Sequence, residues 1–218
     1  MTDLLTPVRD AGVLAVLRAP SPDSALAVVD ALVAGGVTGI EVTFSTPDAP
    51  GVIAAVRERH GDDVLVGAGT VTTVEHARSA AAAGAQFLVS PGTLPDLTAA
   101  MLDTGLVTMT GALTPTEVMV AHGLGSHVVK VFPASLGGPS YLSALRAPLP
   151  DVPLMPTGGV TPDNVAAWYA AGAVAVGAGG DLVPGSALAA GDMDEITRRA
   201  RRFADALRAV RDEQGAAA

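Results

Sequence analysis

The chain has 218 residues, a formal net charge of −9 and no cysteine. Phosphate backbones and anionic lipid surfaces repel an acidic chain, so nucleic acids and membranes are not expected partners. Without cysteine there are no disulfides or zinc–thiolate sites. The chain also lacks a signal-like start and an apolar run long enough to span a bilayer, and these features together predict a cytoplasmic protein.

Short runs rich in Val, Ile and Leu alternate with Ala-rich stretches along the chain. The predicted strands are residues 12–18, 39–44, 64–69, 86–90, 106–110, 127–132, 152–157 and 174–177. The predicted helices are residues 24–34, 47–60, 73–83, 95–104, 114–121, 139–145, 162–171 and 193–211. Strands that alternate with helices imply parallel pairing through right-handed crossovers. Eight such units predict a single (β/α)8 TIM barrel of parallel strands over residues 1–218, with a flexible Ala-rich tail at about 213–218.

Turn and capping signals recur about one strand–helix unit apart. Glycines that follow helices occur at 34–37, 83–85 and 171–173, and Ser-Pro or Thr-Pro helix starts occur at 21–23, 46–48, 114–117 and 161–164. A glycine past a helix is typical of a left-handed C-cap, and Ser or Thr before Pro is typical of an N-cap. These signals support one continuous barrel.

The last predicted helix carries Arg-Arg-Ala-Arg-Arg at 198–202. Such a cluster could be a nucleic-acid patch, but the net charge and the few aromatic residues argue against one. Glu195 and Asp205 lie within a turn of these arginines. We therefore expect a solvated helix face.

Active groups of such a barrel lie at the carboxyl ends of its strands. The thirteen basic residues are twelve arginines and one lysine, Lys130, which has apolar neighbours in a predicted strand. Arginine cannot replace lysine where a neutral amine must attack a carbonyl. Strand alternation places Lys130 and Phe132 on one face, and Glu41 and Thr43 on one face of the second strand. A carboxylate beside an amine suits a proton shuttle beside a nucleophile; the alternative is a structural ion pair.

Two glycine pairs, Gly158–Gly159 and Gly179–Gly180, follow the seventh and eighth strands. Barrels of this kind commonly bind phosphate there through backbone N–H groups, so we expect these four glycines to form a phosphate site. Thr157 precedes the first pair and is a further substrate-binding candidate. The four histidines have no metal-ligand spacing, and no dinucleotide or P-loop motif is complete, so neither a metal nor another cofactor is expected.

Five motifs in family order resemble the 2-keto-3-deoxy-6-phosphogluconate (KDPG) and 4-hydroxy-2-oxoglutarate (KHG) aldolases. They are Gly-Ile-Glu-Val-Thr at 39–43, Val-Gly-Ala-Gly-Thr-Val at 66–71, Val-Ser-Pro-Gly at 89–92, Val-Lys-Val-Phe-Pro-Ala-Ser at 129–135 and Pro-Thr-Gly-Gly-Val at 156–160. The resemblance covers nearly the whole chain and is most specific around Lys130. It implies a class I aldolase that acts on a small 2-keto acid or phosphorylated sugar acid, usually as a homotrimer.

The resemblance also implies residue roles. Lys130 would form the Schiff base and Glu41 would be the general acid and base. Thr70 would bind the pyruvyl carboxylate, with Pro91 and Phe132 as walls of that pocket.

Three positions depart from the pattern that is common in the family. Ser45 stands where many members have an arginine that clamps the substrate carboxylate, and Arg18 resembles an arginine of galactonate-type members that could supply the missing charge. Gly180 stands where a serine is common. These departures leave the substrate epimer open. Two alternatives also stay open: another phosphate-binding barrel, such as a transferase or isomerase, and a non-catalytic assembly scaffold of the same fold.

Overall fold

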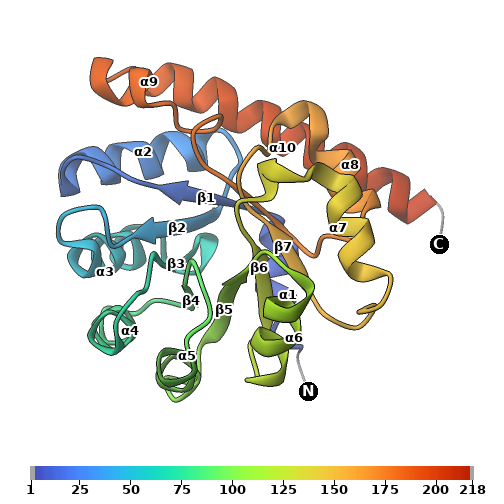
Figure 1. Ribbon diagram of the computed structural model, residues 1–218. Helices are drawn as coiled ribbons and strands as arrows, with labels where there is room; N and C mark the ends of the chain where they lie inside the picture. The colour runs from blue at the N-terminus through green and yellow to red at the C-terminus, as the bar shows by residue number, and fades with distance from the viewer. Residues whose placement is uncertain (1–2, 217–218) are drawn as a thin grey trace.

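A computed structural model describes residues 3–216, and its eight strands form one parallel sheet (Figure 1). The strands are β1 (Val13–Leu17), β2 (Gly39–Thr43), β3 (Leu65–Gly69), β4 (Phe87–Val89), β5 (Val107–Ala112), β6 (Val128–Val131), β7 (Leu154–Pro156) and β8 (Val176–Ala178). Their order is β7-β6-β5-β4-β3-β2-β1-β8, and a parallel bridge between Thr157 and Gly177 joins the two ends. The predicted (β/α)8 barrel is confirmed.

The eight predicted helical segments are all present. They are α2 (Pro22–Ala34), α3 (Ala49–His60), α4 (Val74–Ala82), α5 (Pro95–Leu102), α6 (Pro115–Gly123), α7 (Gly138–Arg146), α8 (Val165–Ala170, after the 3-10 turn Pro162–Asn164) and α10 (Met193–Ala216). Figure 1 shows α10 running along α2 and α8, which it contacts. Of the tail expected at 213–218, residues 213–216 end α10, and residues 217–218 lie outside the described part. No described helix is both long and apolar enough to cross a membrane.

Two short helices were not predicted, α1 (Thr6–Ala11) and α9 (Gly185–Ala190). Leu5 and Val8, at and within α1, pack against the side chains that fill the barrel interior. The other members of this inner cluster are Leu14, Phe87, Val89, Val107, Met109, Val128, Met155 and Ala175. α1 therefore closes the end of the barrel where the strands begin, opposite the end expected to carry the chemistry.

The strands are buried on both faces, as parallel strands between a filled interior and a helix layer must be. In β2 and β6 every residue is buried. Ile40, Val42, Val129 and Val131 point outward into the cluster that packs against the helices. Alternation then turns Glu41 and Lys130 inward.

Three of the four helix starts predicted from Ser-Pro or Thr-Pro begin at the predicted Ser or Thr. Ser21 and Thr114 accept hydrogen bonds from the backbone N–H groups three residues on, and Thr161 forms a capping box. The prediction of Thr46 as an N-cap was wrong. Asp48 caps α3, because the buried Thr46 hydroxyl instead accepts a hydrogen bond from the Ala19 N–H at 3.1 Å.

Candidate active site

The sequence places Lys130 and Glu41 on β6 and β2, and the barrel brings them together. Lys130 Nζ donates to Glu41 Oε1 at 3.1 Å, and their side chains are 6% and 0% exposed. The Phe132 ring lies beside the amine, with its centroid 5.6 Å from Nζ. The lysine side chain is thus confined between a carboxylate and an aromatic wall, with little water around it.

Glu41 has an unused acceptor. Its second oxygen, Oε2, is buried and has no hydrogen-bond partner among the described residues. A buried polar atom without a partner costs free energy and is uncommon in folded proteins. The atom is therefore free to take a proton from a water or a substrate that enters the barrel.

Gly69 on β3 makes room for that carboxylate. A Cβ atom added at this position would overlap the Glu41 carboxyl group. The next residue, Thr70, has a positive φ of 55°, which is strained for a residue with a side chain. Such strain is typical of functional positions, and here it follows the strand that borders Glu41.

Thr43 and Ser45 form a hydroxyl pair at the end of β2. Thr43 Oγ1 donates to the Leu17 carbonyl at 2.8 Å and lies 2.7 Å from Ser45 Oγ. Ser45 is exposed, whereas Thr43 is buried. Because Thr43 donates its one hydroxyl proton to Leu17, Ser45 donates to Thr43 and offers only acceptor lone pairs, and no charge, at the rim of the barrel.

A cavity of about 510 Å³ opens at the carboxyl ends of β1, β7 and β8. Its lining includes Arg18, Phe132, Thr157 and both glycine pairs, Gly158–Gly159 and Gly179–Gly180. Gly158 and Gly159 have φ values of 98° and 74°, which only glycine adopts readily. The N–H groups of Gly159 and Gly180 make no hydrogen bond to any described residue.

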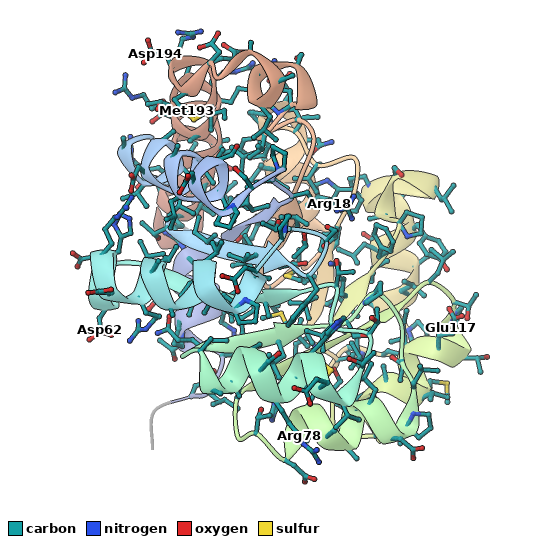
Figure 2. The ribbon with its side chains drawn as sticks, turned by 90° about the vertical axis from the view of Figure 1, so that its left-hand side faces the viewer. Arg18, Asp62, Arg78, Glu117, Met193 and Asp194 are labelled. Atoms are coloured by element: carbon teal, nitrogen blue, oxygen red, sulfur yellow. The ribbon has the colours of Figure 1, made fainter. Side chains whose placement is uncertain are left out.

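Arg18 is the basic side chain of this cavity. It is exposed and makes no salt bridge in the described part of the chain. Figure 2 shows it toward the middle of the view, whereas Asp62, Arg78 and Asp194 lie at the edges. A guanidinium among free N–H groups gives the cavity the character of an anion site.

Pro91 lies in an adjoining hollow of about 210 Å³, which shares Phe132 with the larger cavity. Thr157 is buried, and its Oγ1 has no partner among the described residues. All thirteen predicted site residues therefore lie at or near the carboxyl ends of the strands. No group of three or more His, Asp or Glu side chains within residues 3–216 is placed to hold a metal ion.

Comparison with known proteins gives the family. The family described as "Aldolase: KDPG and KHG aldolase" matches residues 5–199. This chain belongs to that family. It is therefore a class I aldolase, a carbon–carbon lyase.

Two relatives of this aldolase illustrate the range of the family. The 2-dehydro-3-deoxy-phosphogluconate aldolase of Treponema pallidum (strain Nichols) is 42% identical over 186 residues, which cover 85% of this chain and 88% of the relative. The 2-dehydro-3-deoxy-6-phosphogalactonate aldolase of Escherichia coli (strain K12) is 37% identical over 170 residues, which cover 78% of this chain and 83% of the relative. Because both are aldolases, neither the transferase or isomerase alternative nor the scaffold alternative is favoured.

A solved structure connects the family to its chemistry. The KDPG aldolase from Legionella pneumophila, with pyruvate captured at low pH as a covalent carbinolamine intermediate, has a TM-score of 0.84 to this aldolase. The two chains are 30% identical, and the match covers 93% of this chain and 98% of the other.

Sequence reasoning missed two acidic residues near the site of this aldolase. Asp181 lines the larger cavity directly after Gly180, and Glu117 lines the smaller one. Hydrogen bonds from the Thr114 and Leu113 N–H groups lower the pKa of Glu117. The Thr-Pro-Thr-Glu start of α6 signalled Glu117 as a capping residue, but its place beside Pro91 depends on how β4 and α6 pack.

Proposed function

We propose that this aldolase cleaves a 2-keto-3-deoxy-6-phospho sugar acid, of the gluconate or galactonate type, to pyruvate and glyceraldehyde 3-phosphate. Cleavage of 4-hydroxy-2-oxoglutarate to pyruvate and glyoxylate would use the same machinery. The observation that carries the proposal is the buried Lys130–Glu41 pair beside a cavity with free N–H groups and Arg18. The pair supplies the chemistry, and the cavity suits a phosphate.

The reaction begins at Lys130. Its neutral amine attacks the C2 carbonyl and forms a carbinolamine, which loses water to become an iminium ion. Glu41 accepts and returns the protons of this step. Its position 3.1 Å from Nζ supports that role, because a general base must lie within hydrogen-bond reach of its proton.

Glu41 then takes the proton of the C4 hydroxyl group. The C3–C4 bond breaks, its electron pair moves into the iminium ion, and an enamine forms as the aldehyde leaves. Glu41 returns the proton to C3, and water hydrolyses the new iminium ion to release pyruvate and free Lys130. The unpaired Oε2 of Glu41 supports this shuttle, because it leaves one carboxylate oxygen available to the substrate.

The remaining predicted residues hold the two ends of the substrate. We assign the pyruvyl end to Thr43, Ser45 and Thr70, with Pro91 and Phe132 as walls. We assign the phosphate end to Gly158, Gly159, Gly179 and Gly180, with Thr157 beside them. Arg18, which lines the same cavity, would supply the carboxylate-binding charge that Ser45 lacks. The free N–H groups and the positive φ angles of the first glycine pair support the phosphate assignment.

An activity assay tests the proposal. The purified protein is given the gluconate-type and galactonate-type phosphorylated substrates and 4-hydroxy-2-oxoglutarate, and pyruvate release is measured with and without EDTA. We expect release from at least one phosphorylated substrate, undiminished by EDTA. Lys130→Arg should abolish release, because a guanidinium stays protonated. Activity of Lys130→Arg above background would contradict the assignment.

Arg18 and Ser45 decide the substrate in this proposal. Arg18→Ala should raise KM by about tenfold, as expected when a charged hydrogen-bond partner of an anion is lost. Ser45→Arg should lower KM for the gluconate-type substrate relative to the galactonate-type one. If Arg18→Ala leaves KM unchanged for both phosphorylated substrates, Arg18 does not bind substrate.

We also propose that the chain acts as one domain, assembles as a homotrimer and works in the cytoplasm. Exposed apolar side chains support the assembly: Leu94, Met119 and Leu136 are 61%, 60% and 72% exposed. They belong to the segments around β4 to β6, which are neighbours in the sheet. Association would remove this apolar surface from water. The molar mass of the protein in solution tests the homotrimer, which predicts three times the mass of one chain.

A further inference from the structure

The loop after β8 is fastened to α10 by one side chain. Arg199 Nη1 donates to the Asp181 carbonyl at 2.7 Å and lies 3.7 Å from Asp181 Oδ1. On its other side, Arg199 Nε donates to Glu195 Oε1 at 2.7 Å. The arginine is therefore held by Glu195, one helical turn away, and itself holds the loop.

The bond to Asp181 completes a tight turn. The Leu182 and Val183 N–H groups donate to the Gly179 carbonyl at 3.0 and 2.8 Å. The peptide unit that joins Asp181 to Leu182 is thus fixed at both ends, by Arg199 at its carbonyl and by Gly179 at its N–H. Gly180 lies at the tip of this turn with its N–H unused, in the cavity that also contains Arg18.

Asp181 also brings a negative charge close to a cavity suited to an anion, since it is one of the lining residues. An unbalanced negative charge there would repel a phosphate group. The Arg199 guanidinium lies close enough to offset that charge. Glu195 stays ionised as its partner, because hydrogen bonds from Arg199 and Arg198 lower the Glu195 pKa.

We propose that Arg199 is a positioning residue for the phosphate end of the substrate: it fixes the Gly179–Leu182 turn, so that the Gly180 N–H faces the anion, and it offsets the charge of Asp181. This inference rests on the proposed function. It also revises the expectation of a purely solvated face on α10, since the Arg199 side chain is only 29% exposed.

Arg198 provides a matched control. It neighbours Arg199 on α10 and also binds Glu195, with its Nη2 2.9 Å from Oε2, but its side chain is 60% exposed. No hydrogen bond or salt bridge links it to the Gly179–Leu182 turn. Arg198→Gln and Arg199→Gln thus each remove one arginine from the same glutamate, and only the second releases the turn.

The test compares two reactions of each variant. One is cleavage of the phosphorylated substrate, and the other is exchange of the methyl protons of pyruvate with solvent deuterium. The exchange needs the Lys130 enamine but no phosphate. We expect Arg199→Gln to raise KM for the phosphorylated substrate by about tenfold, the effect of losing one charge-assisted hydrogen bond, with kcat and pyruvate exchange within about twofold of the unmodified protein. Arg198→Gln should leave KM, kcat and pyruvate exchange unchanged. Arg199→Lys should give a KM between those of Arg199→Gln and the unmodified protein.

Two results would overturn the inference. In the first, KM is the same in Arg199→Gln and the unmodified protein. In the second, pyruvate exchange falls together with cleavage, which would mean a general structural role; if Arg199→Gln does not fold, Arg199→Lys is judged by the same criteria. Failure of the unmodified protein to exchange pyruvate protons would instead contradict the proposed function.

Discussion

At the scale of single residues, the site depends on a charge pair that does little for stability. Lys130 and Glu41 are almost fully buried, and burying two charges costs about as much free energy as their attraction returns. Glu41 also leaves one oxygen without a partner among the described residues. Chemistry explains this arrangement better than folding does.

Gly69 offers a test of how closely Glu41 must be placed. Gly69→Ala would put a methyl group into the space of the Glu41 carboxylate. We expect kcat to fall by about 10- to 100-fold, because a shift of about 1 Å in a catalytic group has an effect of that order. The measurement is the initial rate of pyruvate release at saturating substrate.

Gly123→Ala is the control for this substitution. Gly123 ends α6, its φ is not positive, and a Cβ atom there would meet nothing within 4 Å. Its kcat should equal that of the unmodified protein. Equal rates for both alanine variants would show that the Glu41 carboxylate tolerates displacement.

At the scale of elements, a histidine side chain links β5 and β6 in addition to the backbone hydrogen bonds between these strands. His127, directly before β6, accepts a hydrogen bond at Nδ1 from the Thr108 N–H at 2.9 Å. Only a ring without a proton on Nδ1 can accept this bond. Burial lowers the pKa of His127 from its ordinary value of 6.5.

The lowered pKa makes stability depend on pH. The unfolded chain takes up this proton more readily than the folded one, so the contribution of His127 is complete above about pH 6.5 and is lost as the pH falls through the lower folded pKa. We expect His127→Gln to reduce the loss of unfolding free energy between about pH 7.5 and about pH 5, measured by urea denaturation. His122→Gln, at an exposed position of α6, should leave this pH-dependent loss of unfolding free energy unchanged.

Most elements could be predicted from the sequence, because buried parallel strands and capped helices leave strong local patterns. Every strand lies within two residues of its predicted bounds. α1 and α9 could not be predicted, since each has only six residues and is stabilised by packing. Thr46 was misjudged for a related reason: its hydroxyl bonds to Ala19, and that contact forms only when β1 and β2 are side by side.

At the scale of the whole molecule, the barrel assembles a site from distant parts of the chain. Lys130 and Glu41 are 89 residues apart in sequence, yet their side chains meet inside the barrel. Alternation along β2 and β6 predicted that Lys130 shares a face with Phe132 and Glu41 with Thr43, and the closed barrel turns both faces inward. The position of Asp181 and the reach of Arg199 from α10 could not be predicted, because they depend on how the last helix packs against the loop after β8.

Every step of the proposed reaction depends on a Schiff base between Lys130 and a 2-keto acid. Incubation with pyruvate and borohydride, followed by protease digestion and mass spectrometry, tests it most directly. A reduced pyruvyl group should be found on Lys130, and the Lys130→Arg variant should carry none. Full loss of activity without a modified Lys130, or modification confined to another amine such as the N-terminus, would show that Lys130 does not form the Schiff base.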